Sequence, residues 1–240
     1  SAILTTRFDW PFFLAFLAAG LLTAAIGVLL SLPSAKIKGD YFALLTLGFA
    51  FVAMAVFINW TNVTRGTLGI RGIERPEGFT EPLQFLVLVL IIVLVSYLIL
   101  RRLTASPFGR VLEAIRDDEM VAESLGKNII KAKMISLGVS GFFVGLAGSL
   151  FAHFIRYISP NSFWLDPLVL SLAAIVIGGL ASLRGALLGA VLVFLFSESL
   201  RFLDIPSSVV GPLRVIIFMV ILLLIILWRP KGIWGRADLE

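Results

Sequence analysis

The side chains that could carry enzyme chemistry are few in this chain. It contains no cysteine and a single histidine, His153, so thiol catalysis, disulfide redox chemistry and cysteine-ligated metal are excluded. The sequence lacks the H-E-x-x-H pattern of zinc proteases, the G-x-S-x-G pattern of serine hydrolases and the G-x-x-x-x-G-K-[ST] loop that holds ATP phosphates. We therefore expect no catalytic residue, no metal site and no cofactor bound by this chain.

Two polar residues in apolar surroundings remain as candidates for chemistry. His153 lies near the end of a long apolar run, where an interfacial histidine is the simpler interpretation. Ser140 stands close to Gly138, Gly141 and Gly145, and small residues in such a run more often allow close helix packing. A serine-based membrane protease stays open as an alternative function, as does a scaffold subunit that has no solute path.

The composition of the chain indicates the kind of protein in which these residues are placed. The chain is 59% hydrophobic and 15% charged, with a mean hydropathy of +1.03. A soluble domain carries about 45–50% apolar and about 25% charged residues, and one core of this size could not bury so much apolar surface. A soluble enzyme, a disordered chain and a disulfide scaffold are thereby disfavoured, and a polytopic membrane protein remains.

Runs without Asp, Glu, Lys or Arg show where the chain could cross a bilayer. An apolar helix needs about 20 residues to do so, and lipid leaves helices as the expected structure for such runs. Two of the runs reach full length only if the flanking Glu198 and Arg214 lie at the interface. We predict an all-α fold of about seven transmembrane helices, at 10–35, 41–64, 82–100, 134–155, 167–183, 185–197 and 215–228.

The distribution of basic residues predicts the orientation. With the connection after the first run inside, thirteen of the 20 Lys and Arg residues lie in cytoplasmic segments and seven outside. Cytoplasmic segments carry the excess of Lys and Arg, so we expect a cytoplasmic C-terminus and a cytoplasmic segment at 106–133. The pI of 9.9 is then a property of a lipid-embedded protein, and no nucleic-acid partner is expected.

No energy source is apparent within the predicted helices. Their central parts lack Asp, Glu, Lys and Arg, the residues that proton-driven carriers usually place at depth. If the protein moves solutes uphill, the energy comes from elsewhere. Sodium coupling through backbone carbonyls of broken helices stays open.

The polar segment 106–133 carries the strongest functional signal. Ser106 followed by Pro107 predicts a helix start, and Gly126 predicts a helix end. One or two short amphipathic helices of this kind suit docking in a groove of a partner protein, although a helix lying on lipid is the alternative. Acidic residues disfavour an anionic membrane surface, and five occur here: Glu113, Asp117, Asp118, Glu119 and Glu123.

Small residues mark two further regions. Two G-x-x-x-G patterns, Gly141 to Gly145 and Gly185 to Gly189, predict close helix packing, and Gly178 and Gly179 precede the second of them. A glycine-rich stretch between the second and third predicted helices cannot form a stable helix. It either lines an aqueous mouth for a polar solute or is a plain surface loop, and its candidate path residues are Asn59, Thr64, Gly66 and Gly69.

Five stretches match a known set of motifs in the same order. They are K-G-D-Y-F-A-L-L-T-L (38–47), T-R-G-T-L-G-I-R-G-I (64–73), the segment from Ser106 to Gly126, V-I-G-G-L-A-S-L-R-G-A-L-L-G-A (176–190) and R-P-K-G-I-W-G (229–235). Together they resemble branched-chain amino-acid ABC transporter permeases of the LivM type. Ala181 stands where that family usually has Gly. The family begins with two or three further helices, so we expect the chain to be truncated at its N-terminus.

The resemblance implies a function and a set of partners. It implies one permease domain over residues 1–240, in a bacterial-type inner membrane, that imports branched-chain amino acids by alternating access; urea, short amides or other small neutral amino acids are the alternative solutes. The implied partners are the lipid bilayer, a homologous second permease, two cytoplasmic ATPases that hold ATP and Mg, and an extracytoplasmic solute-binding protein. The implied ATPase-coupling residues are Gly109, Arg110, Glu113, Ala114, Arg116, Asp117, Glu119, Ala122 and Gly126.

Overall fold

The computed structural model describes residues 1–35, 37, 40–163, 165–199 and 219–220. They belong to two compact units, Ser1–Pro160 and Asn161–Glu240, each of which is described by itself. Five helices among the described residues are long and apolar enough to cross a membrane: Phe12–Ser31, Tyr41–Asn59, Pro82–Thr104, Ile129–Ile155 and Pro160–Gly178. The all-α membrane class is therefore confirmed.

The predicted count of seven transmembrane helices is not confirmed. The sixth run forms a shorter apolar helix, Leu183–Phe196. The run at 215–228 lies outside the described residues, apart from 219–220. One permease domain over residues 1–240 likewise stays a prediction.

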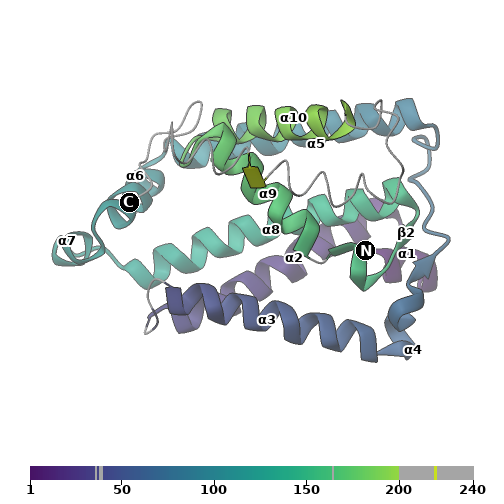
Figure 1. Cartoon of the computed structure of the whole chain (residues 1–240), viewed down its shortest axis with the longest axis horizontal. Helices are drawn as coiled ribbons and strands as arrows, with labels where there is room; N and C mark the ends of the chain where they lie inside the picture. Colours follow the sequence, from purple (N-terminus) through teal and green to yellow (C-terminus); the bar gives the residue numbers. More distant parts are fainter. Residues whose placement is uncertain (36, 38–39, 164, 200–218, 221–240) are drawn as a thin grey trace. The chain divides into compact units, whose positions relative to one another are not determined.

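Four long helices of the first unit run along a common direction (Figure 1). Two short helices, α6 and α7, lie at one end of these helices, and the short elements α4, β1 and β2 lie at the other. The helices and strands of this unit are α1 (Ala2–Arg7), α2 (Phe12–Ser31), α3 (Asp40–Asn59), α4 (Thr61–Thr64), β1 (Ile70–Arg71), α5 (Pro82–Thr104), α6 (Pro107–Asp117), α7 (Glu119–Ser124), α8 (Ile129–Ile155) and β2 (Tyr157–Ile158), with 3-10 turns at Leu32–Ala35 and Gly66–Leu68.

The packing of α2 on α8 depends on small residues. A Cβ at Gly141 would lie 2.6 Å from the Thr23 carbonyl oxygen, and one at Gly145 would overlap the Thr23 side chain. On the α2 side, a Cβ at Gly27 would overlap the Leu137 carbonyl. The two backbones thus approach more closely than larger side chains would allow. A phenylalanine- and leucine-rich cluster covers the next turns: Phe12, Phe16, Phe85, Leu88, Leu146 and Leu150.

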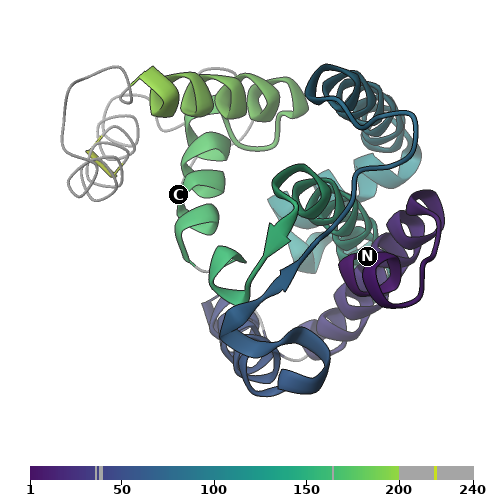
Figure 2. The same cartoon turned by 90° about the vertical axis from the view of Figure 1, so that its right-hand side faces the viewer.

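The far end of this unit is closed by a short antiparallel pairing. Ile70 pairs with Ile158, and Arg71 pairs with Tyr157. Figure 2, which looks at this end, shows the two strands side by side. Ile73 is fully buried there and packs in one cluster with Ala2 and Ala152. The pairing therefore ties the loop after α3 to the end of α8.

The described part of the second unit is a helical hairpin. Its helices are α9 (Leu165–Gly178) and α10 (Leu183–Ser199), and the 3-10 turn at Pro160–Phe163 precedes them. Gly178 and Gly185 lie so close that a Cβ on either would overlap the other's carbonyl, and Gly189 lies in the same way against Ala174. Gly179 belongs to the turn, with φ +113°, and so does Ala181, with φ +57°. The left-handed conformation of Ala181 explains why glycine suits this position.

Candidate functional site

Helix α6 begins directly against the end of α5. The Ser106 hydroxyl caps its first turn by accepting a hydrogen bond from the Gly109 N–H at 3.5 Å, and it donates to the Leu103 carbonyl at 2.6 Å. Gly109 is buried, and a Cβ there would overlap the Thr104 carbonyl. Glycine therefore permits the sharp change of direction between a long apolar helix and a polar one.

Asp118 separates α6 from α7. Its backbone is extended, at φ −156° and ψ 110°, and its carboxylate accepts hydrogen bonds from the N–H groups of Met120 at 2.8 Å and Val121 at 3.1 Å. This residue ends one helix and caps the next. The predicted amphipathic segment thus forms two helices rather than one.

Helix α7 ends in a fixed turn. Gly126 adopts φ +74°; its N–H bonds to the Glu123 carbonyl at 2.9 Å, and the Lys127 N–H bonds to the Ala122 carbonyl at 3.2 Å. These two bonds form a Schellman motif, which favours glycine at this position. The Asn128 side chain then caps α8 by accepting from the Lys131 N–H at 2.9 Å. Every residue between α7 and α8 is thereby held in a defined turn.

Helix α7 is also fastened to α8 by side chains. The Lys133 ammonium lies 2.9 Å from a carboxylate oxygen of Glu119, and both side chains are about three-quarters buried, with exposures of 26% and 27%. Ala122 is 1% exposed. A partly shielded ion pair is screened less by salt than a surface pair. The orientation of α7 relative to α8 is therefore specified by packing and by charge.

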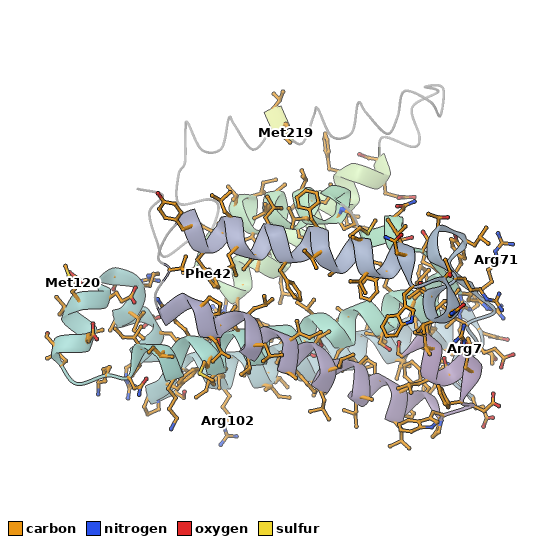
Figure 3. The ribbon with its side chains drawn as sticks, turned by 90° about the horizontal axis from the view of Figure 1, so that it is seen from below. Arg7, Phe42, Arg71, Arg102, Met120 and Met219 are labelled. Carbon is orange, nitrogen blue, oxygen red and sulfur yellow. The ribbon has the colours of Figure 1, made fainter. Side chains whose placement is uncertain are left out.

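Three large apolar side chains project from α7 and its end, and we call them the α7 tip. Met120 is 73% exposed, Val121 54% and Leu125 69%. Figure 3 shows Met120 at the end of the unit opposite Arg7 and Arg71. The coupling residues predicted from the sequence were charged or small, and they did not include Met120 or Val121. Their signal was present in the sequence, because they interrupt an acidic run with large apolar side chains.

The residues predicted to contact ATPases fall into two groups. Those with exposed side chains or backbone are Arg110, Glu113, Ala114, Arg116, Asp117 and Gly126. Arg116 and Asp117 form an exposed ion pair at 2.7 Å. Gly109 and Ala122 are buried and Glu119 is mostly buried, so these three shape and fasten the two helices.

The residues predicted to line a solute path lie at the last residue of α3 and in the turn that follows it. Asn59 donates to the Ala55 carbonyl at 2.8 Å within its own helix. The Thr64 hydroxyl lies 2.6 Å from the Phe57 carbonyl and accepts from the Gly66 N–H at 3.1 Å. Gly66 and Gly69 both have positive φ, and a Cβ at Gly69 would overlap the Ile158 carbonyl. Each of the four residues thus has a structural task at this end of the unit.

A polar pocket of about 300 Å³ opens beside this turn, and we call it the ladder pocket because β1 forms part of its wall. Three arginines and two carboxylates line it, together with two threonines, a glycine and two aliphatic side chains. The lining residues are Thr5, Thr6, Arg7, Asp9, Val63, Arg65, Ile70, Arg71, Gly72 and Glu74.

His153 lies near the end of α8, as the sequence predicts, and its side chain points into the protein. It is fully buried, and its ring packs edge-on against Phe12 at 4.8 Å between centroids. Nδ1 lies 2.8 Å from the Ser149 carbonyl, which can only accept, so Nδ1 carries the proton. Nε2 and the Ser149 hydroxyl find no hydrogen-bond partner among the described residues. The histidine therefore packs within the α2–α8 seam.

Comparison with known sequences decides the family. A family model described as "Branched-chain amino acid transport system / permease component" matches residues 1–227. The chain belongs to this family. Its membership agrees with the short polar helices, the small-residue packing and the apolar spans described above. No solved structure matches the chain.

Individual relatives carry the names of transport permeases. The high-affinity branched-chain amino acid transport system permease LivM of Salmonella typhimurium is 32% identical over 97% of this chain and 59% of its own length. A probable LivM of Methanocaldococcus jannaschii is 28% identical over 92% of the chain and 67% of its own length. The guanosine permease NupQ of Bacillus subtilis is 31% identical over 67% of this chain and 49% of its own length. The chain thus spans about three-fifths of the length of the Salmonella relative.

Proposed function

We propose that this branched-chain amino acid permease is a transmembrane subunit of an ATP-driven importer, in which cytoplasmic ATPases dock on α6 and α7. Family membership supports transport rather than catalysis. The single observation that carries the docking site is the α7 tip, where three large apolar side chains stand exposed on a helix held firmly at both ends. Exposed apolar anchors ringed by charge are typical of protein contacts.

The surroundings of the α7 tip favour a protein partner over lipid. Acidic residues predominate on α7 and the end of α6, and an anionic bilayer surface would repel them. Asp117, Glu123 and Asp118 are all exposed. In this proposal the apolar side chains enter a groove of the ATPase, and the exposed charges of α6, including Arg110, Glu113 and Arg116, set the register along it.

The ATPases supply the energy that the spans lack. They hold ATP and Mg, and a homologous second permease completes the membrane path. A solute-binding protein delivers the solute at the end of the first unit that carries β1 and β2. We further propose the bacterial-type inner membrane as the location, with the α7 tip and the C-terminus on the cytoplasmic side. This agrees with the excess of Lys and Arg in the segments assigned to that side.

The proposed solutes are branched-chain amino acids. The names of the LivM relatives support that choice, and the uncharged central parts of the spans suit an aliphatic solute. The name of the guanosine permease at 31% identity shows that similar chains carry a different solute. Urea, short amides and other small neutral amino acids are therefore the alternatives, and competition of each with leucine uptake separates them.

The docking site is tested by co-purification. The full-length permease with Met120→Ser and Leu125→Ser is expressed together with its ATPases, and the ATPases that remain bound in mild detergent are measured. We expect a loss of at least about tenfold, since buried apolar anchors dominate such interfaces. Leu68→Ser is the matched control, because Leu68 is 71% exposed at the opposite end. Undiminished ATPase binding by the double variant, or an equal loss in the control, would refute the proposed site.

A further inference from the structure

The ladder pocket is lined by charged side chains of both signs that, among the described residues, form no ion pairs with one another. We propose that it binds a free amino-acid zwitterion, with its arginines taking the carboxylate and its acidic residues the ammonium group. This inference rests on the proposed function, because it assigns to this pocket the solute class that the importer would carry. A solute path near the glycine-rich stretch 64–73 is one of the alternatives that the sequence leaves open, but none of its candidate residues, Asn59, Thr64, Gly66 and Gly69, lines this pocket.

The charges of the pocket are available for a ligand. Arg7, Arg65 and Arg71 supply guanidinium groups, and Asp9 and Glu74 supply carboxylates. Among the described residues, no ion pair within 4 Å joins any of these five to another. A ligand that carries both charges on neighbouring atoms can satisfy both sets, which a purely anionic or cationic ligand cannot do.

Two of the arginines are held in place by contacts that leave donors free. One terminal nitrogen of Arg7 donates to the Asn62 carbonyl at 2.7 Å. The Arg71 guanidinium lies over the ring of Tyr157, 5.8 Å from its centroid. A guanidinium has five N–H donors in a fixed fork that matches a carboxylate. Positioned arginines of this kind suit binding of a ligand carboxylate. Figure 3 shows Arg7 and Arg71 at the same end of the unit.

The hydroxyls of Thr5 and Thr6 complete the polar wall. Thr6 donates to the Ala2 carbonyl at 2.7 Å, and Thr5 donates within the same helix at 3.1 Å. A hydroxyl that already donates keeps its lone pairs, so each can accept from an ammonium group. Together with Asp9 and Glu74, these oxygens offer more than one acceptor to a cation that has three donors.

The wall of the pocket is rigid at the point where Arg71 projects. Ile70 and Arg71 pair with Ile158 and Tyr157, and Ile73 is fully buried just beyond them. Such a backbone loses little freedom when a ligand binds, which favours binding by a small molecule.

The size and the apolar lining agree with an aliphatic amino acid. A pocket of about 300 Å³ is at the small end of the range for ligand sites. Val63 and Ile70 form part of the lining and offer a surface for an aliphatic side chain. Urea has no net charges to match the arginines and carboxylates, so the same features disfavour it.

The other occupant to consider is an acidic segment of a soluble protein. Such a segment would prefer a surface with a clear excess of positive charge. Here Asp9 and Glu74 stand among the arginines, and the pocket is close to balanced. The observations therefore favour the zwitterion, and the experiment includes the protein partner as a contrary outcome.

The test measures binding of radiolabelled L-leucine to the full-length permease, purified with its partner subunits in detergent and without any solute-binding protein. We expect saturable binding that excess unlabelled leucine abolishes. N-acetyl-leucine, which lacks the ammonium group, leucinamide, which lacks the carboxylate, and urea should compete at least about tenfold less well, since each lost charged hydrogen bond costs about one order of magnitude.

Variants identify the site. Arg71→Gln and Glu74→Gln should each weaken leucine binding by about tenfold, whereas Arg156→Gln and Glu77→Gln, exposed residues of the same region that do not line the pocket, should leave it unchanged. No saturable binding, unchanged binding by both pocket variants, or full competition by leucinamide would overturn the proposal. So would weaker capture of a soluble binding protein by these variants with unaltered leucine binding.

Failure of this inference differs from failure of the proposed function. Leucine uptake into vesicles that contain the whole importer, ATP and a solute-binding protein tests the function. If uptake is normal in the wild type while the purified permease binds no leucine, amino-acid binding at the ladder pocket is refuted and the proposed function stands. If the wild type takes up no leucine, the proposed function itself is wrong.

Discussion

The ammonium of Lys133 lies 2.9 Å from the carboxylate of Glu119, and this ion pair joins α7 to the first turns of α8. The partners are 14 residues apart and belong to different helices. Because both side chains are largely shielded, the pair fixes the direction in which the α7 tip points. A structural link of this kind is a place where movement of α7 would pass to the transmembrane region.

We expect Lys133→Met to uncouple the transporter. The variant should still bind its ATPases, because the α7 tip is unaltered, but solute-stimulated ATP hydrolysis should fall by about tenfold or more. Hydrolysis is measured in vesicles with and without solute. The exchanged pair, Glu119→Lys with Lys133→Glu, should recover a substantial part of the stimulation, because it restores the attraction. Normal stimulation in Lys133→Met would contradict this role.

Charge reversal on α6 tests the exposed residues. Glu113→Lys and Arg116→Glu should each abolish solute-stimulated ATP hydrolysis while assembly persists, because the reversed charge opposes the ATPase surface during closure. Both side chains are exposed, so little effect on folding is expected. Arg102→Glu, also exposed but on α5, is the control and should retain stimulation. Normal stimulation in both α6 variants would mean that the charges of α6 make no coupling contact.

The close approach of α2 and α8 predicts a stability difference between two glycines of one helix. Gly141→Ala should lower the free energy of unfolding by about 1–3 kcal/mol, because its Cβ would meet the Thr23 carbonyl oxygen, a backbone atom that cannot turn away. At Gly148 no atom lies within 4 Å of the position that a Cβ would take, so Gly148→Ala should leave stability equal or raise it by about 0.5–1 kcal/mol. Thermal unfolding in detergent measures both. Equal shifts would contradict the packing described.

The left-handed turn between α9 and α10 predicts a stabilising substitution. Ala181 adopts φ +57°, a conformation that costs a residue with a Cβ about 1–2 kcal/mol. Ala181→Gly should therefore raise the free energy of unfolding by about 1 kcal/mol, after allowing for the greater freedom of glycine in the unfolded chain. Ala190→Gly, within α10, is the control and should lower it by about 0.5–1 kcal/mol. A lower melting temperature for Ala181→Gly would show that the turn does not strain the alanine.

Local patterns predicted the helical parts of this fold well. Charge-free runs located the long helices, and Ser106, Pro107 and Gly126 marked the limits of the polar helices, because capping is decided by neighbouring residues. The break at Asp118 was not predicted. Asp118 follows the last residue of α6, and its side chain caps the first turn of α7. The sixth run also gave an apolar stretch, Leu183–Phe196, that is shorter than the five candidate membrane spans, since composition does not fix where a turn begins.

Contacts between distant residues could not be predicted from the sequence. Nothing local indicates that Ile70 pairs with Ile158, and without that pairing the ladder pocket has no wall. The glycines of α8 predicted close packing, but not that Thr23 of α2 lies opposite them. The sequence indicated the position of His153 along its helix but not the direction of its side chain, which packs against Phe12.

The continuity of α8 has a mechanical consequence. Its 27 residues, Ile129–Ile155, include Lys133 near their start and end two residues before the strand at Tyr157. They span about 40 Å. A rigid rod of that length acts as a lever: a tilt of about 5° about one end moves the other end by about 3.5 Å. A small rotation of α8 about its polar end would therefore move the paired strands and Arg71.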